Sequence, residues 1–206
     1  MSGLQQTFDA ARPRYTGCKY QYDGLEIALH WATALLVVTL YTIAQIWSFF
    51  PKATHAELLS VHVSLGVLLA VVLVCRIGWR AGPGRGVAPA TTGLLEIASK
   101  LAHYMLYVLL AVVVGFGLCL RWAGHGAISF FGLFTISSPF AANHGLAHLL
   151  FAMHSWAATA LIILAALHAC AALFHHLVLR DDVLQRMLPN GKQGHPGRTG
   201  RLTSDH

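Results

Sequence analysis

The chain has 206 residues, of which 56% are hydrophobic and only 11% are charged, and its net charge is +6. Soluble domains carry about 25% charged residues, so this composition excludes an ordinary soluble protein and indicates a chain surrounded by lipid. A positive net charge can indicate a nucleic-acid partner in a soluble protein. In a membrane protein the cytoplasmic loops account for such an excess, and we expect no nucleic-acid partner.

Four apolar stretches are long enough to cross about 30 Å of hydrocarbon. They run from Leu25 to Phe49, from Leu58 to Trp79, from Leu101 to Leu120 and from about Leu149 to Leu179. The first twenty residues are polar and lack an apolar core, so we expect no cleavable signal peptide and a retained first span. The predicted fold class is an all-α integral membrane protein, a bundle of four transmembrane helices.

The basic residues predict the orientation of this bundle. Of the fourteen lysines and arginines, three precede the first span, four lie from Arg76 to Lys100 and five follow the fourth span, and only Lys52 and Arg121 fall in the other two connections. The positive-inside rule therefore puts both termini and the middle connection in the cytoplasm. We expect a multi-pass membrane protein with this orientation.

The connections leave little room for a second domain. We divide the chain into an N-terminal cytoplasmic segment (1–24), a membrane domain (25–189) and a polar C-terminal tail (190–206) that we expect to be disordered. The stretch from Ala81 to Thr92 is rich in glycine and proline and predicts a linker. The longest outer connection, from Arg121 to His148, carries four phenylalanines, as expected of an interfacial loop or of a cap over a site.

Two histidines in the fourth span, His154 and His168, are fourteen residues apart within a run that lacks Asp, Glu, Lys and Arg from Trp122 to Leu179. In a coiled bundle with 3.5 residues per turn they lie on one face, roughly 21 Å apart along the axis. One helix could therefore supply a ligand to each of two stacked cofactors.

Two further histidines lie at matching depths. His62 lies near the outer end of the second span, level with His154, and His30 lies near the cytoplasmic end of the first, level with His168. A single histidine near a span end is more often an interfacial or hydrogen-bonding residue, but polar residues at membrane depth are costly and usually functional. Two haem irons, each held between two imidazoles, would account for all four histidines together.

The other histidines have more open interpretations. His175 lies seven residues beyond His168 and is expected to face the bundle interior, where it could contact a haem propionate or a quinone. His103, at the cytoplasmic start of the third span, could make similar contacts and is the chief rival ligand for the inner haem. His144 and His148 are four residues apart and could form half of a metal site, but no acidic partner is close in the sequence.

Several motifs together resemble the bacterial cytochrome b561 family over about Tyr20 to Pro189. They are LHW (29–31), VHVSLG (61–66), MHSW (153–156), and LHACAALFHH (167–176) followed by RDDVLQRMLP (180–189). The resemblance implies four membrane helices that hold two haem b groups, with His30, His62, His154 and His168 as axial ligands. These are the same four histidines that the depths selected.

The resemblance also implies a reaction. The members that this chain is most similar to resemble superoxide oxidases, which would pass electrons from periplasmic superoxide through the haems to ubiquinone. Lys52 and Arg121 leave the outer side weakly positive, which favours steering of a small anion, although two basic residues could fall there by chance. As the alternative, related proteins anchor a dehydrogenase or hydrogenase subunit and relay its electrons, with the outer loop as the docking surface. A haem-free transporter is disfavoured because, apart from Glu26 at the start of the first, the spans lack acidic residues.

Overall fold

The computed structural model describes residues 22–82, 93–124, 126–139, 141–180 and 184–188. Within this part of the chain the long helices are α2 (Gly24–Ile46), α3 (Lys52–Ala81), α4 (Leu94–Ala123) and α5 (His144–Phe174). Each is long and apolar enough to cross a membrane, counting the short turns that extend α2 to Phe49 and α5 to Leu179. The predicted bundle of four membrane helices is confirmed.

The helix α2 begins within one residue of the predicted span, but the other three begin several residues earlier than predicted, at Lys52, Leu94 and His144. Hydropathy locates only the part of a helix that lies in hydrocarbon, whereas the backbone stays helical until a local signal ends it. Pro51 precedes α3, and Gly93 precedes α4 with a φ of 68°. The Asn143 side chain caps α5 by accepting a hydrogen bond of 2.9 Å from the Leu146 N–H.

The connection after α4 contains a β-hairpin that the sequence analysis did not predict. Strands β1 (Ile128–Phe130) and β2 (Phe134–Ile136) pair antiparallel, and the chain turns at Phe131 and Gly132 with φ angles of 47° and 75°. The buried Ser64 hydroxyl fastens this hairpin to α3. Its oxygen lies 3.1 Å from the Ser129 carbonyl and accepts a hydrogen bond of 3.0 Å from the Phe131 N–H.

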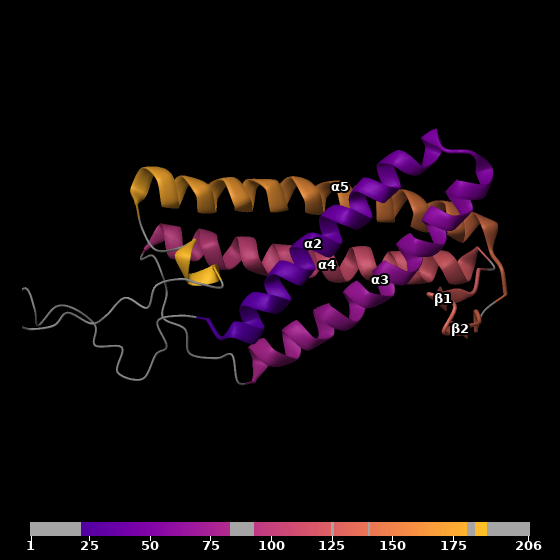
Figure 1. Ribbon diagram of the computed structural model, residues 1–206, viewed down its shortest axis with the longest axis horizontal. Helices are drawn as coiled ribbons and strands as arrows, with labels where there is room; N and C mark the ends of the chain where they lie inside the picture. The colour runs from indigo at the N-terminus through magenta and orange to yellow at the C-terminus, as the bar shows by residue number, and fades with distance from the viewer. Residues whose placement is uncertain (1–21, 83–92, 125, 140, 181–183, 189–206) are drawn as a thin grey trace, which may run out of the picture.

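The helices pack in two pairs, α2 along α3 and α4 along α5, and the pairs cross at an angle (Figure 1). The hairpin lies at one end of the bundle, which we call the hairpin end. At the opposite end, the terminal end, α2 begins, α3 stops, α4 begins and α5 stops. That this end faces the cytoplasm stays a prediction. The tail 190–206 and most of the Ala81 to Thr92 linker lie outside the described residues.

The buried core is small, because most of the apolar surface faces lipid. A cluster at mid-height joins all four helices: Leu40, Leu69, Leu73, Leu110 and Leu161. After α5 the chain forms a π-helical turn, η2 (His175–Leu179), and a short 3₁₀ turn, η3 (Gln185–Met187). The indole N–H of Trp31 on α2 donates a hydrogen bond of 2.8 Å to the Met187 carbonyl, so the segment after α5 is fastened beside His30.

One ion pair joins α2 to α3 at the terminal end. The Arg80 Nη1 atom donates to Glu26 Oε1 at 2.7 Å, and Glu26 is only 5% exposed. A carboxylate in such a place is costly unless its charge is paired. The pair therefore holds the start of α2 against the end of α3.

We expect Glu26→Gln to lower the thermal stability of the bundle, because the buried acceptor loses its charge. The loss should be about 1 kcal/mol, limited by the solvent exposure of Arg80. Thermal unfolding in detergent, followed by circular dichroism, would measure it. Glu96→Gln is the matched control, since Glu96 pairs with the exposed Lys100 at 2.6 Å and should contribute less. Equal melting temperatures for the two variants would contradict a structural role for the Glu26–Arg80 pair.

Candidate functional site

A cavity of about 270 Å³ lies between the helices in the half of the bundle nearer the hairpin. This volume is close to the lower end of the range for small-molecule pockets, roughly 300–1,000 Å³. The lining is mostly apolar and comes from all four helices. It includes Leu40 and Tyr41 from α2, His62 and Gly66 from α3, Gly117 and Arg121 from α4, and His154 and Ala158 from α5.

His62 and His154 face each other across this cavity. Their ring centroids are 6.4 Å apart and their planes are inclined at 76°. A metal ion bonded to one nitrogen of each ring at ~2.0–2.1 Å, as in zinc–imidazole sites, would hold the centroids roughly 6 Å apart. The separation of the two rings therefore fits a metal bound between them.

The backbone orients the His154 ring. Its Nδ1 atom is 2.9 Å from the Val113 carbonyl, which can only accept, so Nδ1 carries the proton and Nε2 keeps its lone pair. Metal-binding histidines are commonly oriented by such a bond. His62 Nδ1 is buried without a well-aligned hydrogen bond, although the Leu40 backbone lies nearby. Both rings are half-buried inside the bundle.

Two glycines make room at this site. A Cβ atom at Gly117 would lie 3.1 Å from Cε1 of His154, so a side chain there would push the ring from its place. A Cβ atom at Gly66 would meet nothing within 4 Å, and Gly66 lines the cavity, so a side chain there would enter the open space. These glycines leave a space into which a flat macrocycle could fit between the helices.

A second group of polar residues lies nearer the terminal end and comprises His30, Arg76, His103 and His168. The rings of His103 and His168 are in edge-to-face contact, with centroids 4.9 Å apart. Arg76 is hydrogen-bonded to His30 at 2.9 Å and lies over the Tyr107 ring. His30 is within electrostatic reach of both His103 and His168. The structure thus brings His30 and His168 to one level, as expected from their depths, together with the rival His103.

His30 and His103, the two candidate ligands opposite His168, differ in their hydrogen bonds. Arginine only donates, so the Arg76 contact makes Nδ1 of His30 an acceptor and puts the ring proton on Nε2. A histidine that binds metal through Nε2 carries its proton on Nδ1. His103 already has that arrangement, because its Nδ1 donates to the Ser99 carbonyl at 2.7 Å. Metal binding by His30 through Nε2 would therefore require Arg76 to release it.

Three other histidines considered in the sequence analysis lie on α5 and in the turn that follows it. His175 is half-buried at the start of the π-helical turn, below His168 on α5. His144 and His148 are exposed on the first two turns of α5. Among the described residues there is no group of three or more His, Cys, Asp or Glu side chains placed to hold a metal ion.

The sequence analysis did not single out two residues that shape these sites, Trp47 and Gly117. The Trp47 ring stacks on His55 and contacts the His62 ring, with centroids 5.4 Å apart in both cases. The absence of a side chain at Gly117 leaves room for the His154 ring. A glycine within an apolar helix was a visible signal, but the sequence did not indicate which side chain it would contact. It also did not indicate that Arg76 would be hydrogen-bonded to His30.

Facing imidazoles across an apolar cavity, inside four membrane helices, are the arrangement of a b-type membrane cytochrome. The chain belongs to the prokaryotic cytochrome b561 family, whose model matches residues 21–190. Members of this family are membrane proteins that bind haem b and transfer electrons. The family predicted from the sequence motifs is confirmed.

Curated relatives of nearly the same length support this assignment. Cytochrome b561 homolog 2 of Escherichia coli K12 is 30% identical over 84% of this chain and 94% of its own length. Cytochrome b561 homolog 1 of the same organism is 32% identical over 84% and 99%. The probable superoxide oxidase CybB of Yersinia pestis is 29% identical over 82% and 96%.

We expect Gly66→Leu to reduce the haem content of the purified protein, because the new side chain would occupy the cavity between His62 and His154. Gly78→Leu is the control, since Gly78 lies on the same helix, is exposed and does not line this cavity. The ratio of haem to protein, measured by the pyridine haemochrome method, should fall only for Gly66→Leu. An unchanged ratio in a folded Gly66→Leu protein would show that haem does not enter this cavity.

Proposed function

We propose that this chain is a di-haem b cytochrome that carries electrons from superoxide, at the hairpin end, to ubiquinone in the bacterial inner membrane. The observation that carries the proposal is the pair of facing imidazoles, His62 and His154, across an apolar cavity. A relative described as a probable superoxide oxidase supports the choice of donor. The excess of basic residues at the terminal end supports a cytoplasmic location for that end.

His62 and His154 would hold one haem iron, and His30 and His168 would hold the other. Bound haem would supply the one-electron chemistry, and two axial histidines would leave its iron no open position for oxygen. The protein would contribute fixed ligands, an apolar surrounding and backbone acceptors that orient the rings. His103 and His175 are the proposed contacts for a haem propionate or for the quinone.

The reaction balances with two one-electron donors for each quinone. Two superoxide anions each lose one electron and leave as dioxygen, and the two electrons together with two protons convert ubiquinone to ubiquinol. The oxidation of superoxide to dioxygen releases no proton. Both protons of ubiquinol must therefore reach the quinone from the surrounding water. Arg76 and the histidines at the terminal end lie where such protons would enter from the cytoplasm.

The ligand assignment predicts which haem each variant loses. His62→Ala and His154→Ala should each remove the same haem, and His168→Ala should remove the other, because a haem with one axial ligand is held weakly. Haem content and the reduced absorbance spectrum of each purified variant would measure the loss. Retention of both haems in His62→Ala or His154→Ala would refute the assignment.

His30 and His103 compete for the position facing His168, and the same measurement decides between them. We expect His30→Ala to lose the haem at that level and His103→Ala to keep it. The opposite result would assign ligation to His103, which already presents its Nε2 lone pair, and would leave Arg76 and His30 as a separate hydrogen-bonded pair.

A direct test mixes the oxidised, purified protein with superoxide in a stopped-flow spectrometer, with and without a soluble ubiquinone. Rapid haem reduction followed by quinone-dependent reoxidation is the expected result. Haem reduction no faster than in a free haem peptide would refute superoxide as the donor.

The hairpin end also supports a second function, an electron-relaying anchor for a dehydrogenase or hydrogenase subunit. Leu133 is 78% exposed at the tip of the hairpin, and Phe131, Phe134 and Ile136 are exposed beside it. Apolar surface beyond the membrane core can serve as a protein interface. A soluble subunit that co-purifies with this chain, together with slow reduction by superoxide, would favour the anchor.

A further inference from the structure

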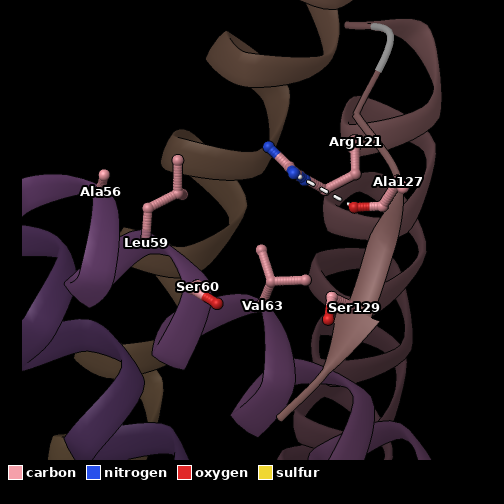
Figure 2. Close-up of a pocket in the computed structure, with 7 residues that line it drawn as sticks. All are labelled: Ala56, Leu59, Ser60, Val63, Arg121, Ala127 and Ser129. Carbon is pink, nitrogen blue, oxygen red and sulfur yellow. Dashed lines mark hydrogen bonds between the residues drawn. The ribbon is translucent and has the colours of Figure 1, made fainter. Parts of the chain in front are cut away.

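A second, smaller cavity of about 90 Å³ lies beside Arg121, between α3 and the hairpin (Figure 2). A water molecule needs only ~10–15 Å³ of such space, so the cavity has room for a small molecule of a few atoms. Its lining combines apolar side chains with hydroxyl groups and one cation: Ala56, Leu59, Ser60, Val63, Arg121, Ala127 and Ser129.

Arg121 belongs to both cavities. Its side chain extends from α4 toward α3, as Figure 2 shows, and it also lines the larger cavity that holds His62 and His154. Arg121 therefore lies, with Leu59 and Val63, between the small cavity and the proposed haem site. A molecule bound to Arg121 would lie next to that site without entering it.

The guanidinium is poorly neutralised by the protein. Its Nη2 donates a hydrogen bond of 3.1 Å to the Ala127 carbonyl, and its buried Nε has no hydrogen-bond partner. Within the described part of the chain, no carboxylate lies within ion-pair distance of Arg121. A half-buried cation with an unused N–H donor and no counter-ion favours an anion beside it.

The position of this side chain is built into the fold. A Cβ atom at Gly126 would lie 2.6 Å from Cζ and 2.9 Å from Nε of Arg121. Any larger residue at position 126 would therefore displace the guanidinium. A cation in the last turn of a helix is favoured by the helix dipole, which explains a basic residue at the end of α4. The dipole does not explain why the side chain folds over Gly126 into the boundary between two cavities.

We propose that Arg121 and the small cavity bind a small oxygen-bearing anion against the proposed haem site. Two sources share this chemistry: a free monovalent anion, with superoxide as the substrate, and the carboxylate of a haem propionate. The choice of superoxide rests on the proposed function. At this site one superoxide gives one electron to the oxidised cytochrome and leaves as dioxygen, and no proton is consumed.

The test compares two variants that remove the guanidinium in different ways. Arg121→Gln removes its charge, whereas Gly126→Ala keeps the charge and moves the group out of place. The controls are Lys52→Gln, which removes an exposed charge at the same end, and Gly115→Ala, which adds a methyl group to an exposed position on α4 with nothing within 4 Å. All are purified with haem bound.

Formate is the probe for the site, because it is a small carboxylate that does not depend on superoxide chemistry. Its effect on the absorbance spectrum and midpoint potential of the haems is titrated at constant ionic strength maintained with gluconate. We expect a saturable effect in the original protein and both controls, and its loss in Arg121→Gln and Gly126→Ala. Formate should also slow haem reduction by superoxide in the original protein.

The superoxide rate constant gives the second readout. It should fall about tenfold or more in both Arg121→Gln and Gly126→Ala if the anion is bound at a defined place near the haem. It should change less than about twofold in Lys52→Gln, because an exposed charge is screened by salt. If surface charge merely attracted superoxide in general, the rate constant of Gly126→Ala would equal that of the original protein. That result would refute the binding of a free anion at Arg121.

The remaining outcomes distinguish a free anion from a haem propionate, and the anion site from the proposed superoxide donor. If formate has no effect but both variants shift the midpoint potential or lose haem, the site holds the propionate carboxylate. If the original protein is not reduced by superoxide but still responds to formate through Arg121, the donor is wrong and the anion site stands. If formate has no effect and both variants match their controls in haem content, midpoint potential and rate, the anion site is refuted.

Discussion

The structure depends on the cost of placing polar groups where no water can reach them. In hydrocarbon every backbone group must be bonded within the protein, so the chain forms uninterrupted helices, and the polar side chains turn inward toward one another. The four histidines and Arg76 are such side chains. Each lies at a contact between helices, and the Val113 carbonyl bonded to His154 shows that the backbone itself serves as a partner. The proposed functional groups are therefore the polar side chains that bond to one another, or to the backbone, between the helices.

The same constraint explains how much of the protein the sequence could predict. The four helices followed from apolar length, and the two levels of histidines followed from the fourteen-residue spacing of His154 and His168, because helical geometry fixes both. The hairpin did not follow, since its two strands are three residues each and it is fastened by Ser64 from a distant part of the chain. The Arg76 and His103 contacts also depend on how the helices cross, which no single helix encodes.

The two levels of histidines differ in their hydrogen bonds, which determine which ring nitrogen is free to bind a metal ion. At the hairpin level, the bond from Nδ1 to the Val113 carbonyl leaves the Nε2 lone pair of His154 unused, and His154, Gly66 and Gly117 all line the cavity. At the terminal level, three histidines and an arginine lie together, and His30 is held by a donor that competes with metal binding. Metal binding by His30 through Nε2 would therefore require its hydrogen bond with Arg76 to change, at the same level where the proposed function needs protons.

The two ends of the bundle also differ in the charge near the histidines, because Arg121 lies at the hairpin end. A protein that accepts electrons from an anion needs positive charge close to the accepting group, and one unneutralised guanidinium is more useful there than several exposed lysines, because exposed charges are screened within about a Debye length. The absence of a side chain at Gly126 leaves the space that this guanidinium occupies. Gly126 lies just before β1, so the connection that contains the hairpin helps to determine where the positive charge of Arg121 lies relative to the proposed haem site.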